Sequence, residues 1–151
     1  MAEISIDQIK SLRDRTGLSV ADVKKALTEA GGDEARAMEL LKARGGDVAA
    51  KKAGRELKAG IVEAYVHSNR KIGCMLELLC ETDFVARNEG FLGLAHDLAM
   101  HITAMKPADN EELLEQPFIK DPNQTIKEVI TAHIAKIGEN IQVGRFEVFQ
   151  I

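Results

Sequence analysis

The chain of 151 residues is 45% hydrophobic but only 4% aromatic, with no Trp, so it can bury one moderate core built mainly from aliphatic side chains. This composition excludes an intrinsically disordered protein. The net charge of −4 excludes a basic nucleic-acid footprint over the whole chain. Apolar runs fall short of the roughly 20 residues that cross a bilayer, and the charged start lacks a signal-peptide core. We therefore expect a cytoplasmic protein without a membrane or direct nucleic-acid partner.

The first 46 residues predict three short helices. Each has apolar residues at helical spacing and ends at a glycine signal, and Ser or Asp stands where a cap is needed. We expect these helices over residues 4–15, from Ser19 to Ala30, and from Asp33 to Gly45-Gly46. Residues 1–46 would then form a compact module that is barely large enough to fold alone.

A linker is predicted over residues 47–59. The stretch is rich in Ala, Lys and Gly and has no strong apolar face, so it reads as helical or flexible. Residues 1–55 contain 11 Lys and Arg against 9 Asp and Glu, whereas residues 56–151 contain 9 against 15. A slightly basic module followed by an acidic body suits a protein with more than one contact surface.

Residues 60–151 predict a small α+β core. Two apolar runs, IVEAYVH and KIGCMLELLC, are separated by a polar turn and indicate an antiparallel β-hairpin. On the first strand we expect Val62, Ala64 and Val66 to form the buried face. A helix capped by Asn88, a last helix that begins with a capping box at Thr125, and a final strand complete the pattern. The fold class is therefore α+β, with helices packed on an antiparallel sheet.

No motif for catalysis or metal binding is present in the sequence. There is no phosphate loop, HExxH or nucleophile elbow, and the four His residues lack zinc-ligand spacing. Cys74 and Cys80 lie six residues apart, about 20 Å along one strand, which is too far for a disulfide. We expect buried free thiols, no cofactor or metal, and a protein that is not an enzyme.

His101 has two interpretations. It stands one turn before Met105, near the end of a predicted helix, where a cation would be stabilised by the helix dipole. It could equally be a contact residue for a partner. Its spacing does not choose between these roles.

Asp83 and Phe84, in the stretch CETDFVARN, also have two interpretations. The stretch joins a predicted strand to a predicted helix, where an Asp is most simply a helix cap and a Phe most simply a core residue. The functional alternative is a ring that reaches into another protein. Local pattern favours the structural interpretation.

Several segments, taken in order, resemble one family along nearly the whole chain. They are MAEISIDQIKSLRDRTGLSVADVKKALTEAGGD at the start, AAKKAGR at 49–55, ETDFVARNEGF at 81–91, LAMHITAMKP at 98–107 and IAKIGENIQVGRF at 134–146. The chain resembles the bacterial elongation factor Ts family, guanine-nucleotide exchange factors for elongation factor Tu. TDFV followed by KIGEN is much more specific than any single motif.

The resemblance implies that the helical module binds elongation factor Tu. In the family this module is similar to a ubiquitin-associated domain and grips the partner's nucleotide-binding domain. The positions of this sequence that match the family's contacts are Arg13, Val20, Ala21 and Lys24.

The resemblance also reverses the local interpretation of the TDFV stretch. Thr82, Asp83, Phe84 and Val85 match the motif that disturbs the partner's magnesium site. Phe84 is expected to enter between two helices of the nucleotide domain, and Asp83 to act near magnesium and phosphate. Val85 and Cys80 are still expected to face inward. His101 matches a position that touches another domain of the partner.

The sequence departs from the family in two respects. Family members commonly have Cys where Val23 stands and Met near Val20 and Ala21, so the first contact is tuned differently. Longer members have a duplicated core, whereas only about ten residues follow Pro107 before the segment QPF. Because the short sheet leaves open edges, we expect a homodimer. The alternative to an exchange factor is a plain binding module that acts through residues 1–50 alone.

Overall fold

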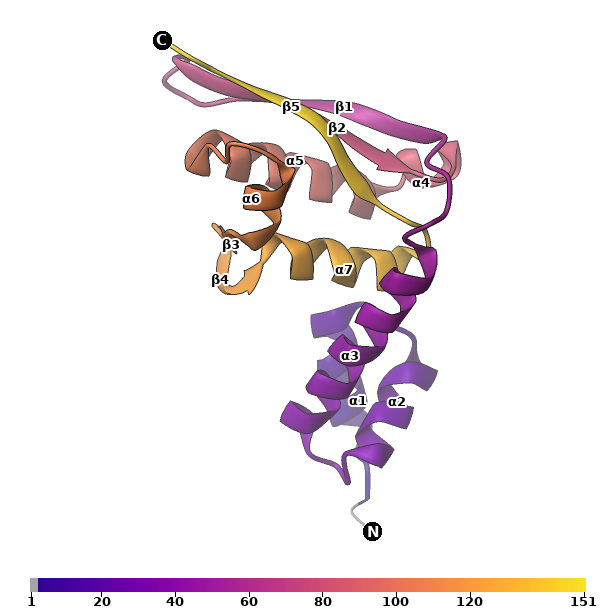
Figure 1. Ribbon diagram of the computed structural model, residues 1–151. Helices are drawn as coiled ribbons and strands as arrows, with labels where there is room; N and C mark the ends of the chain where they lie inside the picture. The colour runs from indigo at the N-terminus through magenta and orange to yellow at the C-terminus, as the bar shows by residue number, and fades with distance from the viewer. Residues whose placement is uncertain (1–2) are drawn as a thin grey trace.

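The computed structural model describes residues 3–151 and has an N-terminal helical part followed by a mixed part (Figure 1). The elements are α1 (Ile6–Thr16), α2 (Val20–Glu29), α3 (Glu34–Lys52), β1 (Ala59–Val66), β2 (Ile72–Cys80), α4 (Asp83–Ala86), α5 (Glu89–Met105), α6 (Asn110–Glu115), β3 (Pro117–Phe118), β4 (Asp121–Thr125), α7 (Ile126–Ile137) and β5 (Gln142–Gln150). The predicted α+β class is confirmed.

The three predicted N-terminal helices are present, and side chains cap each of them. Ser5 forms a capping box with Gln8, Ser19 accepts a hydrogen bond from the backbone N–H of Asp22, and Asp33 caps α3. The module has its own core of Leu12, Val23, Ala26, Leu27, Ala30, Ala37 and Leu41. Val23 is therefore a packing residue.

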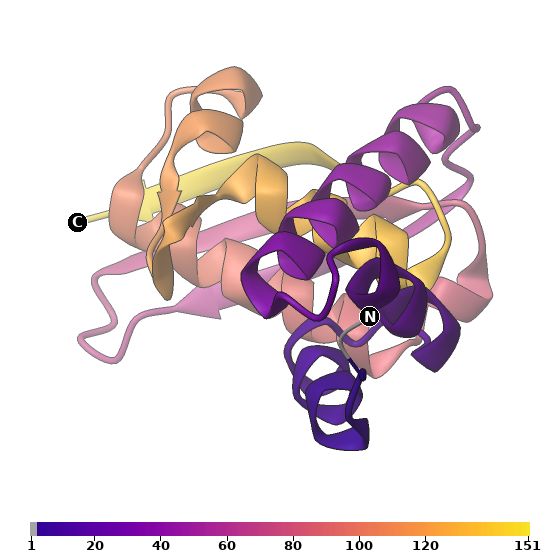
Figure 2. The same ribbon diagram turned by 90° about the horizontal axis from the view of Figure 1, so that it is seen from below.

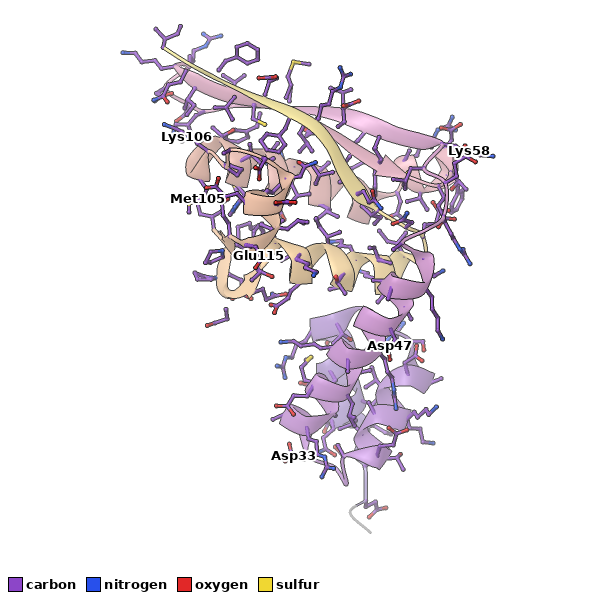
Figure 3. All side chains as sticks on the ribbon, in the orientation of Figure 1. Asp33, Asp47, Lys58, Met105, Lys106 and Glu115 are labelled. Atoms are coloured by element: carbon purple, nitrogen blue, oxygen red, sulfur yellow. The ribbon has the colours of Figure 1, made fainter. Side chains whose placement is uncertain are left out.

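The third helix does not end at Gly45-Gly46 as predicted. α3 continues to Lys52, so Asp47, inside the predicted linker, is helical (Figure 3). A helical Gly costs about 1 kcal/mol relative to Ala, which tertiary packing can offset. The packing is visible at Gly45, where an added Cβ would lie 3.4 Å from the Cβ of Ala135 on α7. The missing side chain lets α3 approach α7, and this contact joins the module to the rest of the chain.

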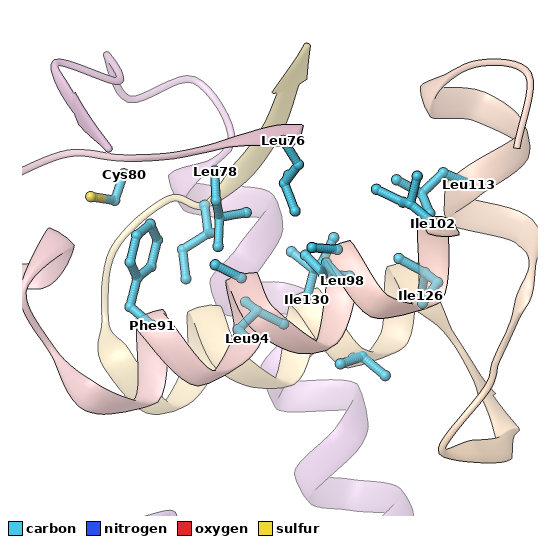
Figure 4. Close-up of a cluster of buried hydrophobic side chains, with 14 of the residues drawn as sticks. Leu76, Leu78, Cys80, Phe91, Leu94, Leu98, Ile102, Leu113, Ile126 and Ile130 are labelled. Atoms are coloured by element: carbon cyan, nitrogen blue, oxygen red, sulfur yellow. The ribbon is translucent and has the colours of Figure 1, made fainter. Parts of the chain in front are cut away.

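The mixed part is layered. A sheet of order β1-β2-β5, antiparallel throughout, lies over α5, and α7 lies beneath α5 (Figure 1). Seen from below, α3 crosses α7 at an angle (Figure 2). β2 supplies buried side chains to the core, and α5 and α7 supply most of the others (Figure 4). None of the helices within residues 3–151 is long and apolar enough to cross a membrane.

The face of β1 that was predicted to be buried is the exposed one. Val62 is 63% exposed and Val66 is 66% exposed. The face toward the helices consists of Ile61, Glu63 and Tyr65, which pair with Leu78, Leu76 and Cys74 of β2. Both faces of β1 carry apolar residues, so alternation within β1 could not decide. The buried face of β1 is set by its pairing register with β2, whose own buried face is unambiguous.

Candidate protein-binding site

Phe84 points into solvent. It is 84% exposed, whereas its neighbours Val85 and Ala86 on the one-turn helix α4 are buried. The predicted inward orientation of Val85 and Cys80 is confirmed. Burying a Phe side chain is worth about 1.5–3 kcal/mol, and Phe84 gives up most of that stabilisation in the free chain. An exposed ring beside a buried turn is suited to a contact with another protein.

α4 begins at Thr82. The Thr82 side chain accepts a hydrogen bond from the backbone N–H of Val85 at 3.3 Å, which is an ordinary N-cap. The extended backbone of Thr82 then turns the chain from β2 into the helix. Thr82 therefore fixes where the turn starts, while Val85 anchors it to the core.

A second turn, between α7 and β5, holds the start of this loop. The Glu139 carboxylate accepts hydrogen bonds from the backbone N–H groups of Glu81 (3.1 Å) and Thr82 (3.0 Å) and from the Thr82 hydroxyl (2.7 Å). In the reverse direction, the Glu81 carboxylate accepts from the backbone N–H of Asn140 at 2.8 Å. The two turns are thus cross-linked by two carboxylates that each accept backbone hydrogen bonds from the other turn.

The turn between α7 and β5 is also fixed to the end of α3. The buried side-chain amide of Asn140 donates to the carbonyls of Ala53 (3.4 Å) and Arg55 (2.9 Å). Lys52 donates to the Gly138 carbonyl, and the Arg55 guanidinium lies 3.6 Å from the Glu81 carboxylate. The end of α3, the turn at 138–140 and the loop that carries Phe84 therefore form one hydrogen-bonded network.

Asp83 is exposed at the start of α4. Together with Lys58 and residues of β1 and β2 that include Gly60 and Val62, it lines a shallow depression at the end of the sheet. Its carboxylate makes no ion pair among the described residues.

The four predicted contact residues of the helical module are all exposed. Val20, Ala21 and Lys24 belong to α2, where Ala21 and Lys24 border a shallow depression, and Arg13 lies on α1. In Figure 1, α2 lies below α7, whereas α4 lies at the level of the sheet. The structure therefore places the predicted site residues on two separate surfaces.

His101 is completely buried, and of the other predicted site residues only Val85 is also buried. Its Nε2 lies 2.9 Å from the Gln116 side-chain oxygen, and its Nδ1 accepts from the backbone N–H of Ile119 at 3.2 Å. Burial lowers the pKa of His101 below its ordinary value of 6.5. The interpretation as a stabilising cation at the helix end is therefore wrong, because burial and the bond that Nδ1 accepts from Ile119 favour the neutral ring, and the Gln116 bond, which favours the charged ring, is the smaller effect. A direct contact with a partner would require the segment around Gln116 and Ile119 to move.

The cysteines are buried free thiols, as predicted. Burial raises the pKa of Cys74 to about 11 and also raises that of Cys80, whose thiol lies near Glu139. Among residues 3–151, no group of His, Cys, Asp and Glu side chains is arranged to hold a metal ion.

Sequence reasoning missed Glu139, Asn140 and Glu81. Glu81 and Glu139 are separated by 58 residues, and no local pattern predicts that their turns meet. The only signal was indirect, because both turns fall in segments that carry the family resemblance.

These features define a class of protein: a helical module and an α+β core that present two exposed surfaces, one of them with an aromatic ring on a braced loop. A family model described as Elongation factor TS matches residues 81–151. The chain belongs to the elongation factor Ts family, a family of translation factors. Close relatives cover nearly all of it.

Three of these relatives are named Elongation factor Ts. The protein of Desulforamulus reducens is 42% identical over 100% of this chain and 90% of its own length. The protein of Fervidobacterium nodosum is 44% identical over 99% of this chain and 98% of its own length. The protein of Thermotoga petrophila is 41% identical over 99% of this chain and 96% of its own length. The first alignment has 196 positions for the 151 residues of this chain, so at least 45 of its positions have no counterpart here.

Proposed function

We propose that this protein is a guanine-nucleotide exchange factor in translation elongation. It binds elongation factor Tu in the GDP-bound state, disturbs the magnesium and phosphate site, and promotes GDP release so that GTP can bind. The observation that carries the proposal is Phe84, which is 84% exposed on a turn fixed by hydrogen bonds to another part of the chain. A rigid aromatic ring of this kind is a typical hot-spot residue.

The Phe84 ring acts as a wedge between two helices of the partner's nucleotide domain. Its transfer from water into an apolar crevice contributes about 1.5–3 kcal/mol to binding. Asp83, next to it and without an ion pair, brings a negative charge to a site that already holds phosphates and a magnesium ion. Thr82 and Val85 hold the wedge in place.

Exchange needs no covalent chemistry, so we propose that the protein is not an enzyme in the catalytic-site sense and uses no cofactor of its own. By linkage, a factor that weakens GDP binding is itself bound less tightly when GDP is present. A ten-thousandfold faster release requires a dissociation barrier lower by about 5.5 kcal/mol. We propose that it acts in the cytoplasm, where its partner works.

The helical module provides the second contact. Arg13, Val20, Ala21 and Lys24, all exposed, bind the nucleotide domain at a distance from the wedge. Two separated contacts orient the partner against the loop, which one contact could not do. For His101 we propose an indirect role: its two hydrogen bonds hold Gln116 and Ile119, whose segment then meets another domain of the partner.

Release of a fluorescent GDP analogue from elongation factor Tu tests this function. The intact protein should accelerate release, and Phe84→Ala should reduce the acceleration by about tenfold or more, because hot-spot aromatics contribute about 2 kcal/mol or more and 1.4 kcal/mol is tenfold. Arg87→Ala, an exposed residue just after α4, is the matched control. Unchanged release with the intact protein contradicts the proposal.

We also propose that two copies associate through the outer face of the sheet. This face carries the exposed apolar residues Val62, Val66, Met75 and Phe149. β1 and β5 are both open edges. The Desulforamulus reducens relative has at least 45 aligned positions that this chain lacks, so we propose that a second copy covers this face.

Light scattering at micromolar concentration tests the dimer. The intact protein should have twice the mass of one chain, and Met75→Glu should produce monomers by burying a charge at a two-fold interface. Leu92→Glu places the same charge at an exposed apolar position on α5 and should leave the dimer intact. A monomeric mass for the intact protein contradicts the dimer without affecting the exchange proposal.

A further inference from the structure

The Glu139 carboxylate is surrounded by donors from the loop that carries Phe84. Its Oε1 accepts from two successive backbone N–H groups, at Glu81 and Thr82, and its Oε2 accepts from the Thr82 hydroxyl. Hydrogen bonds to an ionised acceptor are stronger than those between neutral groups. We propose that Glu139 is a positioning residue for nucleotide exchange, which sets the direction of the Phe84 ring without touching the partner. This inference rests on the exchange function proposed above.

The Thr82 hydroxyl relays this position to α4. It donates its hydrogen to Glu139 and accepts from the backbone N–H of Val85, so both of its roles are fixed at once. α4 has only four residues, and a single turn of helix is not stable by itself in water. Loss of the Glu139 carboxylate frees the hydroxyl to rotate and removes two backbone bonds, so the first turn depends on buried Val85 and Ala86 and on the Cys80 thiol, which donates to the Thr82 carbonyl. Phe84 lies between Thr82 and Val85 in the chain and would sample more directions once Thr82 is no longer fixed.

Glu139 is itself held before any partner arrives. Gly138 precedes it in a left-handed conformation with φ of 90°, the C-cap of α7, and Lys52 donates to the Gly138 carbonyl. Asn140 follows it and is bound to the carbonyls at the end of α3. The carboxylate therefore does not need to be ordered when the partner binds, which is the condition for preorganised positioning.

The charges near Glu139 argue for a role in placement and against a stability role. Glu81 and Asp83 are both acidic and close to the same turn, and among residues 3–151 Glu81 has a cation, Arg55, as its partner whereas Asp83 has none. A third carboxylate among them adds repulsion that a Gln would avoid. Because Gln keeps an acceptor oxygen and the same length, Glu139→Gln should retain the bonds to the two backbone N–H groups.

The experiment compares Glu139→Ala, Glu139→Gln and the matched control Glu128→Ala. Glu128 accepts a hydrogen bond from the Thr125 backbone in the capping box at the other end of α7, so its removal costs a similar bond far from Phe84. Glu139→Ala should reduce accelerated GDP release by about tenfold or more, since a misplacement of about 1 Å can cost up to a hundredfold. Glu139→Gln keeps the two backbone bonds but puts an NH2 group where an oxygen accepted from the Thr82 hydroxyl, so its exchange rate should fall between those of the intact protein and Glu139→Ala. Glu128→Ala should exchange as the intact protein does.

A variant cycle with Phe84→Ala separates positioning from general destabilisation. If Glu139 acts through the ring, Glu139→Ala has no further effect on release once Phe84 is Ala. An equal loss in both backgrounds overturns the proposal, as does a Glu139→Ala protein that exchanges like the intact one.

Amide hydrogen exchange in the free protein supplies a readout that does not depend on elongation factor Tu. Glu139→Ala should increase the exchange rates of the Thr82 and Val85 amides by about tenfold or more, while amides in the middle of α5 stay protected. Unchanged rates at Thr82 and Val85 overturn the positioning role. If the intact protein fails to accelerate GDP release, the proposed function fails, and these amide rates still show whether Glu139 holds the loop.

Discussion

The Thr82 hydroxyl lies 2.7 Å from the Glu139 carboxylate, although 57 residues separate them in the chain. The contact joins the residues that follow β2 to the turn that precedes β5, and β5 is the neighbour of β2 in the sheet. The pairing of β2 with β5 thus brings the two turns together, and one short hydrogen bond links them at the turn that presents Phe84. Replacement of either residue should affect the exposed ring before it affects the core.

Phe84 and Phe91 offer a direct comparison of an exposed and a buried ring. Phe84→Ala should change the free energy of unfolding by no more than about 0.5 kcal/mol, because the ring is 84% exposed. Phe91→Ala should cost about 3–5 kcal/mol, because Phe91 is fully buried among the residues of β2 and α5. Urea unfolding of both variants measures the difference. A large loss for Phe84→Ala would mean that the ring packs in the free protein.

Two glycines should respond in opposite ways when they are replaced by Ala. Gly46→Ala should stabilise by about 1 kcal/mol, since Gly46 is inside a helix and an added Cβ meets nothing within 4 Å. Gly31→Ala should destabilise by about 1–2 kcal/mol, because its φ of 63° is left-handed. Thermal unfolding should show a melting temperature that rises for the first variant and falls for the second. A decrease for Gly46→Ala would indicate that α3 is broken at this position.

Buried His101 predicts a pH dependence of stability. Its folded pKa lies below the ordinary value of 6.5, so the unfolded chain binds a proton more readily than the folded chain. The stability associated with the neutral ring is therefore complete above about pH 6.5 and is lost as the pH falls toward the folded pKa. Glu77 and Asp121, whose pKa values are also lowered, titrate below 4.5 and 3.8 and do not affect this window.

Unfolding free energies between pH 5 and 7.5 test this linkage. The free energy of unfolding of the intact protein should decrease as the pH falls from 7.5 to 5. In His101→Gln, whose side chain cannot titrate, this free energy should depend less steeply on pH. Equal slopes for the intact protein and His101→Gln would rule out His101 as the source.

The two thiols should be unreactive in the folded protein. Both are buried, and a pKa of about 11 for Cys74 leaves almost no thiolate at pH 8. An aromatic disulfide reagent at pH 8 should label neither Cys74 nor Cys80 until denaturant unfolds the chain, and labelling should follow the unfolding transition. Rapid labelling under native conditions would contradict the buried arrangement of β2.

The sequence was a reliable guide wherever a signal was local. Capping residues such as Ser19, Asp33 and Thr125 stand where the helices begin, and the apolar runs form the predicted hairpin. Local signals failed where both outcomes were locally acceptable. The two faces of β1 are similarly apolar, and the glycine pair in α3 is a helix-end signal unless its packing against α7 is known.

The sequence alone determined the α+β class and the three capped helices, and the ordered family resemblance led to the prediction that Thr82 to Val85 contact a partner. Only the tertiary structure decided which way Phe84 points, why His101 is neutral, and which distant carboxylate braces the loop. Helix caps depend on neighbours within four residues, so the chain carries that information directly. Burial and the Glu139 contacts arise from pairing between segments more than 50 residues apart, and that pairing exists only once β2, α7 and β5 have packed.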